Sequence, residues 1–130
     1  MSDETNSKNY EAGMDVRRAM WGKAGAEDRV AQASDFNRPF EDLVTEYCFG
    51  DVWNRPGLDK KTRSIVTVAV LTALTKPNQL KVHVEGAIAN VVSKEELRAI
   101  IMHSSVYAGI PTGVEAMHAA RETLAKLGLE

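Results

Sequence analysis

The stretch that decides the fold runs Asp59-Lys-Lys-Thr-Arg-Ser-Ile-Val-Thr-Val-Ala-Val-Leu-Thr-Ala-Leu-Thr75. Asp59 is a natural N-cap, so the stretch predicts a helix from Lys60 to about Thr75. Its β-branched residues would also suit a strand, but its length and its alanine and leucine residues favour a helix. Beyond Arg63 the helix is apolar on most sides, which predicts that neighbours surround it. The apolar run is too short to span a membrane.

Helical patterns on both sides of this stretch predict an all-α fold. Asn37 is expected to cap a helix whose first turn holds Pro39. Ser93-Lys-Glu-Glu96 is a capping box, and Thr112-Gly-Val-Glu115 is expected to open the last helix. No hairpin signal or long repeat occurs. With the helix described above, about six helices are expected, at about residues 10–21, 38–49, 60–75, 80–91, 93–108 and 112–126.

Apolar spacing assigns an inward face to the helices on either side of the decisive stretch. In the segment 38–49, the residues at helical spacing are Phe40, Leu43, Val44 and Tyr47. In the segment 80–91, they are Leu80, Val84, Ala87, Ile88 and Val91. Residues three or four positions apart lie on one side of a helix, so each set predicts a buried stripe.

Length and charge limit the classes of function. A chain of 130 residues fits one domain, which we expect over residues 10–130 behind a flexible tail at residues 1–9. The tail resembles no targeting signal, and a cytoplasmic location is expected. A net charge of -2 provides no broad cationic face for nucleic acid. Cys48, the only cysteine, excludes an intrachain disulfide and a thiolate-rich metal site.

Several segments together resemble the 4-carboxymuconolactone decarboxylase family, in the family's order and spacing, over about residues 36 to 125. The segments that carry the resemblance are Leu43-Val-Thr-Glu-Tyr47, Gly50-Asp-Val-Trp-Asn-Arg-Pro-Gly-Leu-Asp59, Thr62-Arg-Ser64, Leu71-Thr-Ala-Leu74, His83 and Val106-Tyr-Ala-Gly-Ile-Pro111. The resemblance implies an alkylhydroperoxidase-D-like helical bundle, a homo-oligomer (trimer or hexamer) and no cofactor. It also implies the loss of carbon dioxide from 4-carboxymuconolactone to give 3-oxoadipate enol-lactone, a step in the protocatechuate branch of aromatic catabolism.

The wider superfamily also contains thiol enzymes with a Cys-x-x-Cys-x-x-x-His motif and a glutamate one helix earlier. When His83 is aligned with the histidine of that motif, Lys76 and Gln79 occupy the two thiol positions and Ser64 occupies the glutamate position. Disulfide chemistry needs a thiolate and a resolving thiol, and Cys48 alone cannot replace them. The sequence therefore disfavours peroxide reduction.

The implied decarboxylation requires three kinds of group. Electrons from the departing carboxylate move onto the lactone oxygen, so the site needs a donor at that oxygen, a general acid and a cation for the remaining carboxylate. His83, the histidine shared across the superfamily, is the candidate acid or donor, because an imidazole titrates near working pH. The alternative is a half-buried histidine bonded to a backbone carbonyl.

Glu46, Arg55 and Arg63 are the charged candidates. Glu46 shares an expected helix face with Leu43 and Phe49, where partial burial would suit it to proton transfer; alternatively it is an exposed residue or the partner of an arginine. Arg55 and Arg63 are expected to bind carboxylates, because a guanidinium offers two parallel hydrogen bonds. Structural ion pairs with Glu46 or Asp59 are the alternative for both arginines.

Aromatic residues complete the candidate site. Tyr107 and His103 lie one helical turn apart and could share a face, with the Tyr107 hydroxyl donating to a ligand or simply packing in the core. Trp53 is expected in the pocket wall or in a subunit contact. With His118, the three histidines lack ligand spacing, so no metal is expected.

The sequence leaves alternative functions open. The chain could be a relative that acts on or binds another small carboxylated lactone or acid, or a helical oligomer without catalysis. One departure from the family pattern is Asn90-Val91-Val92, where relatives tend to have Asn-Gly. This departure puts the local geometry after the fourth helix in question, while the proposed catalytic groups are untouched.

Overall fold

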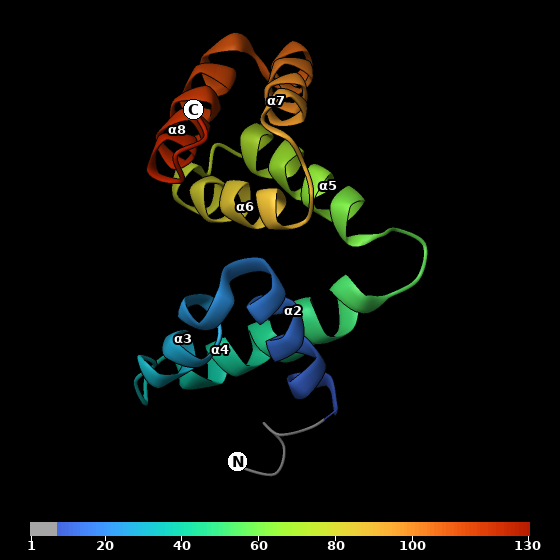
Figure 1. Ribbon diagram of the computed structural model, residues 1–130, viewed down its shortest axis with the longest axis vertical. Helices are drawn as coiled ribbons and strands as arrows, with labels where there is room; N and C mark the ends of the chain where they lie inside the picture. The colour runs from blue at the N-terminus through green and yellow to red at the C-terminus, as the bar shows by residue number, and fades with distance from the viewer. Residues whose placement is uncertain (1–7) are drawn as a thin grey trace. The chain divides into compact units, whose positions relative to one another are not determined.

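The computed structural model describes residues 8–130, all of whose regular elements are helical. The chain divides into two compact units, one up to Leu58 and one over Asp59–Glu130 (Figure 1). The all-α prediction is confirmed. The single domain expected over residues 10–130 stays a prediction.

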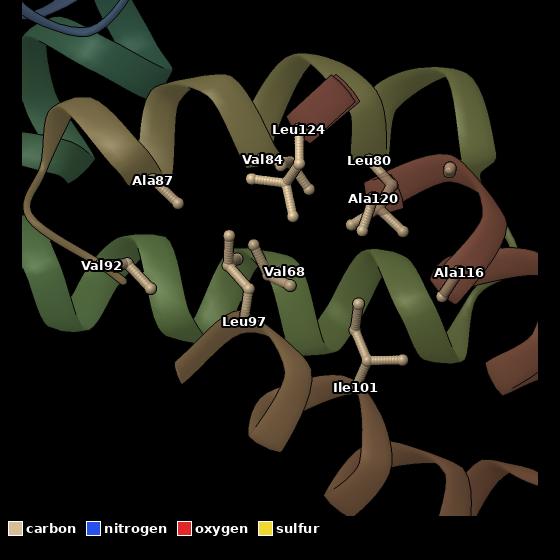
Figure 2. Close-up of a cluster of buried hydrophobic side chains, with 11 residues drawn as sticks. Val68, Leu80, Val84, Ala87, Val92, Leu97, Ile101, Ala116, Ala120 and Leu124 are labelled. Atoms are coloured by element: carbon tan, nitrogen blue, oxygen red, sulfur yellow. The ribbon is translucent and has the colours of Figure 1, made fainter. Parts of the chain in front are cut away.

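The second unit consists of four helices around one apolar core. These are α5 (Lys60–Ala73), α6 (Pro77–Ala89), α7 (Lys94–Ala108) and α8 (Ile110–Lys126). All four helices contribute fully or almost fully buried side chains, and Figure 2 shows Val68, Leu80, Leu97 and Ile101 among them. Burying each such aliphatic side chain contributes about 1.5–3 kcal/mol, so the core holds this helical arrangement together.

The caps predicted from the sequence form at two helix starts. The Asp59 carboxylate accepts a hydrogen bond of 2.7 Å from the Thr62 amide at the start of α5. The Ser93 hydroxyl and the Glu96 carboxylate complete the reciprocal capping box of α7. The box expected at Thr112 does not form, because α8 begins at Ile110 with Pro111 in its first turn.

Two burial predictions for the second unit are wrong in the single chain. The α5 helix is not covered on most sides, because Val66 and Val70 are about half exposed. On α6, Leu80, Val84 and Ala87 are buried as predicted, whereas Val91 is 75% exposed. The reason is that the helix ends at Ala89, so Val91 follows in a left-handed turn with φ 71°.

The first unit packs α2 (Lys8–Gly25) against a π-helix, η1 (Val44–Asp51). Gly13 permits the close approach, because a Cβ there would lie 2.0 Å from the Thr45 carbonyl oxygen. The unit also contains α3 (Glu27–Ala31), α4 (Arg38–Leu43) and the short 3₁₀ helix η2 (Val52–Asn54). The α3 helix was not predicted, and α2 continues past the predicted end, with a non-helical Gly22.

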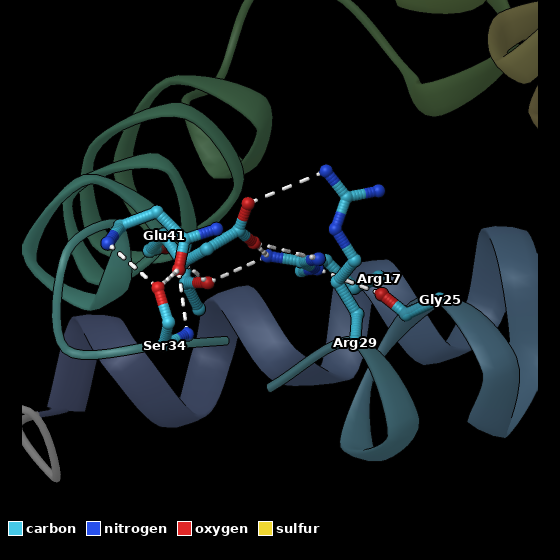
Figure 3. A network of polar contacts seen from close by, with 7 residues as sticks. Arg17, Gly25, Arg29, Ser34 and Glu41 are labelled. Carbon is cyan, nitrogen blue, oxygen red and sulfur yellow. Dashed lines mark hydrogen bonds and ion pairs between the residues drawn. The ribbon is translucent and has the colours of Figure 1, made fainter. Parts of the chain in front are cut away.

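A buried polar network joins α2 to α4 and η1. Arg17 donates to the Thr45 hydroxyl (2.8 Å) and the Gly25 carbonyl (2.8 Å), and it pairs with Glu41 (3.4 Å). Arg29 reaches the second Glu41 oxygen at 3.3 Å (Figure 3). These partners compensate the cost of burying Arg17 and Glu41, so the network fixes how α4 packs on α2.

The expected inward face of segment 38–49 is wrong in the single chain. Phe40, Leu43 and Tyr47 are more than half exposed, whereas Glu41 and Asp42 are buried. The pairing of Arg17 with Glu41 turns the charged side of this segment inward. In addition, the segment changes from α-helix to π-helix at Val44, which alters the side on which later residues lie. The Asn37 side chain accepts from Ser34 instead of capping the helix.

The amino-terminal prediction is tested only in part. Residues 1–7 of the expected flexible tail lie outside the described residues. Lys8 and Asn9 already belong to α2, so the expected tail is wrong for these two residues. Within residues 8–130, no helix combines the length and apolarity that a membrane span requires.

Candidate functional site

A pair of cations marks the start of α5. Lys60 and Arg63 lie one helical turn apart, and both side chains are half-buried. Burial, and then the neighbouring Arg63 guanidinium, lower the pKa of the Lys60 ammonium. Two like charges near a helix N-terminus, where the helix dipole adds positive potential, favour a bound anion.

Lys61, the third cation in the first turn of α5, does not join Lys60 and Arg63. Lys61 forms an ion pair with Glu96 of α7 at 3.1 Å. Asp59 is occupied as the cap of α5, where its hydrogen bond to Thr62 lowers the pKa of its carboxyl. The alternative that Asp59 neutralises Arg63 thus gains no support from the described ion pairs, and Arg63 stays a predicted carboxylate-binding residue.

A hydrogen bond ties the start of α5 to the end of α6. The Asn90 amide donates to the buried Ser64 hydroxyl at 3.0 Å, next to Arg63. The Thr67 hydroxyl in turn donates to the Arg63 carbonyl at 2.7 Å. The bond between Asn90 and Ser64 holds the backbone next to Arg63 at the end of α6, the helix that carries His83.

His83 lies in the middle of α6, one residue before the fully buried Val84. Burial lowers the pKa of its imidazole from 6.5 to about 4. This lowered pKa contradicts the expectation that the imidazole titrates near working pH, because the partly buried ring loses hydration that would stabilise its charge. At neutral pH the ring is uncharged, and a neutral imidazole still offers one N–H donor.

The Tyr107 and His103 side chains share one face of α7, as predicted. Their ring centroids are 5.3 Å apart. Both side chains are exposed, and Tyr107 is 81% exposed, which excludes the core-packing alternative for this tyrosine in the single chain. Their role in binding stays a prediction.

The remaining candidates belong to the first unit. Glu46 lies half-buried on η1, and within the first unit none of the described ion pairs includes it, so the alternative of an arginine partner gains no support there. The π-helix also removes its expected shared face, because Phe49 is buried while Leu43 is exposed. Arg55 is exposed and pairs with Asp51 at 2.8 Å, a partner that the sequence did not indicate.

Trp53 is a core residue of the first unit. Trp53 is 9% exposed, and its ring centroid lies 5.9 Å from that of Phe49, in a cluster with Val16 and Met20. The single chain thus offers no exposed indole face for a pocket wall or a subunit contact. The predicted binding role of Trp53 receives no support from this burial.

Two kinds of chemistry gain no support from the structure. Burial raises the pKa of the Cys48 thiol, which keeps it protonated and a poor nucleophile at neutral pH. Within residues 8–130, no three His, Cys, Asp or Glu side chains gather as a metal site would require. The alternative of thiol-dependent peroxide chemistry remains disfavoured.

Lys60 was not predicted as part of the candidate site. The two arginines were expected to bind carboxylates in preference to the lysines, because a guanidinium offers two parallel hydrogen bonds. The signal that could have identified Lys60 is its spacing, since positions 60 and 63 share a helix face. Asn90 was likewise noted only as part of a departure from the family pattern, although it holds Ser64.

The fold and these residues define an all-helical protein in which a cationic helix start lies beside a second helix that carries a partly buried histidine. The model of the carboxymuconolactone decarboxylase family matches residues 38–122, and the chain belongs to this family. It is 39% identical over 129 residues to the 4-carboxymuconolactone decarboxylase of Acinetobacter baylyi, covering 99% of this chain and 94% of that protein.

Another relative is named for a different activity. The nitrosuccinic acid decarboxylase of Metarhizium robertsii is 36% identical over 123 residues, covering 95% of this chain and 86% of that protein. A third relative, a 4-carboxymuconolactone decarboxylase of Pseudomonas putida, is 39% identical over 44 residues, which are 34% of this chain and 92% of that sequence. The relatives thus share decarboxylation and differ in the acid.

Proposed function

We propose that the protein is a cofactor-free carboxy-lyase that converts 4-carboxymuconolactone to 3-oxoadipate enol-lactone and carbon dioxide. The observation that carries this proposal is 39% identity to a 4-carboxymuconolactone decarboxylase over almost the whole of both chains. The second unit supplies chemical support, since it has two neighbouring cations and a neutral imidazole on packed helices.

The reaction places a distinct demand on each group. When the carboxylate leaves as carbon dioxide, the electron pair of the broken carbon–carbon bond moves through the ring double bond onto the lactone carbonyl oxygen. A donor aimed at this oxygen stabilises the charge that develops there. The dienolate carbon then takes a proton, which restores the carbonyl.

His83 is the proposed donor to the lactone oxygen. Because its pKa is lowered to about 4, the ring is neutral at pH 7 and acts through its N–H rather than as a standing acid. Arg63, with Lys60 beside it, is proposed to hold the carboxylate that is not lost. Glu46 and Arg55 belong to the other unit, and their parts in proton transfer and binding stay predictions.

A second candidate substrate is nitrosuccinic acid, which the name of the Metarhizium robertsii relative favours. Loss of the carboxylate next to the nitro group would leave the electron pair on the nitro oxygens. The same donor and the same cations would serve this reaction, because negative charge again develops on oxygen while one carboxylate remains. The substrate is therefore decided by shape and not by a different set of catalytic groups.

Turnover of the two acids by the purified protein tests the proposal. Loss of 4-carboxymuconolactone should be matched by formation of enol-lactone and carbon dioxide, without added metal or cofactor. Faster turnover of nitrosuccinate would make that acid the substrate. No turnover of either acid would contradict decarboxylation and leave a binding or non-catalytic protein.

We also propose a homo-oligomer, a trimer or hexamer, in the cytoplasm. Exposed apolar side chains support assembly: Phe40 and Tyr47 in the first unit, and Val66, Val70 and Val106 in the second. Large exposed apolar patches commonly mark protein interfaces. The cytoplasmic location rests on the lone Cys48 thiol, which suits a reducing compartment.

A further inference from the structure

A cleft between α7 and α8 contains none of the proposed catalytic residues. It has a volume of about 130 Å³. Its floor is apolar and belongs to the core of the second unit, with Leu97, Ile101 and Leu124 as buried members and Met117 partly buried beside them. Engineered apolar cavities of about this volume hold a benzene-sized ligand.

The remaining lining residues include three cations. Lys94 and Arg98 lie one turn apart on α7, and Arg121 faces them from α8. Within residues 8–130, no acidic side chain pairs with Arg98, which is exposed. An apolar floor beside a guanidinium matches a ligand that has an apolar body and one carboxylate.

The structure already holds a carboxylate beside this cleft. Gly128 turns the chain back after α8 with φ 74°, and the Leu129 amide donates to the Leu124 carbonyl at 2.8 Å. Glu130 then forms an ion pair with Arg121 through its side chain. Its main-chain oxygen accepts a hydrogen bond of 3.2 Å from Lys94. Two of the three cations thus contact one acidic residue.

We propose that this cleft binds a small monocarboxylate whose apolar body is about the size of a benzene ring. The ring lies against the partly buried Met117 and the edge of Leu124, above the buried Leu97 and Ile101, and the carboxylate pairs with Arg98. Glu130 competes for this site, because its carboxylate neutralises Arg121 and adds negative charge at the cleft mouth. The site is separate from Arg63 and His83, so it stands whether or not the proposed decarboxylation is correct.

Benzoate titration of the full chain, labelled at its methionine methyl groups, tests the proposal. The Met117 methyl signal, assigned with Met117→Leu, should shift and saturate at millimolar benzoate, while the signal of the exposed Met102 on α7 stays in place. Arg98→Gln should weaken binding about tenfold, the usual loss for a guanidinium–carboxylate pair. Glu130→Gln should tighten it several-fold.

Controls separate this site from general charge effects. Lys126→Gln removes an exposed cation of α8 that does not line the cleft, and it should leave binding unchanged. Uncharged benzamide should bind about tenfold more weakly than benzoate. Absence of saturation, equal binding of benzamide, or unchanged binding by Arg98→Gln with an unchanged melting temperature would each overturn the proposal.

Discussion

His83 shows at the scale of a single residue how burial sets chemical role. An ordinary histidine is partly protonated near neutral pH, but burial in α6 favours the uncharged ring. A neutral ring suits the donor role at the lactone oxygen and not the role of a standing acid. The sequence identified the residue, whereas its charge state depends on how much water the folded chain leaves around it.

The first prediction concerns the titration of His83. Its imidazole signals in an NMR titration, assigned with His83→Gln, should show a midpoint near the value of about 4 that burial sets. A midpoint near the ordinary 6.5 would contradict the proposed burial effect.

The second prediction concerns the effect of the lowered His83 pKa on the stability of the fold. Between pH 4 and 6.5 the unfolded chain takes up a proton that the folded chain refuses, so folding should become more stable as the pH rises through this window. The lowering of the His83 pKa from 6.5 to about 4 corresponds to about 3 kcal/mol in the free energy of unfolding. Urea unfolding at pH 4 and pH 7 should show a pH dependence that His83→Gln reduces by up to this amount. An equal pH dependence in the variant would disprove the linkage.

The third prediction concerns Arg63. Arg63→Lys keeps the charge but loses the two parallel hydrogen bonds, and Arg63→Gln loses both. The value of kcat/KM for the acid substrate should fall by about tenfold to a hundredfold in Arg63→Gln and by less in Arg63→Lys. Lys61→Gln is the matched control, because Lys61 pairs with Glu96. Equal losses in Arg63→Gln and Lys61→Gln would argue against a specific carboxylate site.

At the scale of elements, the turn after α6 carries strain that the sequence already indicated. Val91 adopts φ 71°, a left-handed conformation that costs a β-branched residue about 1–2 kcal/mol. Its side chain is 75% exposed, so it gains little from packing. Valine at position 91, where relatives tend to have glycine, thus lowers the stability of this turn.

The fourth prediction follows from this turn. Val91→Gly should raise the free energy of unfolding by about 0.5–1 kcal/mol, because glycine adopts positive φ without a steric penalty. Val106→Gly is a matched control, since Val106 is 74% exposed but lies inside α7, where replacing valine by glycine should destabilise by about 0.3–0.5 kcal/mol. Chemical denaturation measures both, and the same sign of change in the two variants would rule out the strain.

Two helix starts and one buried face of the second unit could be predicted, because local signals in the sequence determine them. Asp59 and the Ser93 capping box set two helix starts, and the spacing of Leu80, Val84 and Ala87 set a buried face. The segment 38–49 could not be predicted in this way. Its inner face depends on Arg17, a distant residue that pairs with Glu41, and on the change to a π-helix.

At the scale of the whole molecule, exposed apolar side chains explain why burial on α5 was overpredicted. The sequence indicated that neighbours surround this helix, yet Val66 and Val70 remain about half exposed in one chain. The proposed homo-oligomer would supply this missing cover. The sequence supplied the candidate catalytic residues through family resemblance, but spacing along the chain could not place Arg55 on Asp51 or Trp53 in a core.

The fifth prediction concerns assembly. The mass in solution should be three or six times the 14.3 kDa of one chain. Val70→Glu should shift the equilibrium toward single chains, because it places a charge on an exposed apolar face of α5. Ala125→Glu, at an exposed site on α8, is the control. Sedimentation equilibrium measures the masses, and a wild-type protein of 14.3 kDa would contradict assembly.

The most direct test of the central claim is the comparison of wild-type protein and His83→Ala in the turnover of 4-carboxymuconolactone, with folding checked by circular dichroism. Loss of one donor to a developing oxyanion costs about a hundredfold to a thousandfold in kcat. The wild-type protein should therefore form enol-lactone and carbon dioxide in equal amounts, and the folded variant should lose at least a hundredfold in rate. Full turnover by His83→Ala would contradict the role of His83.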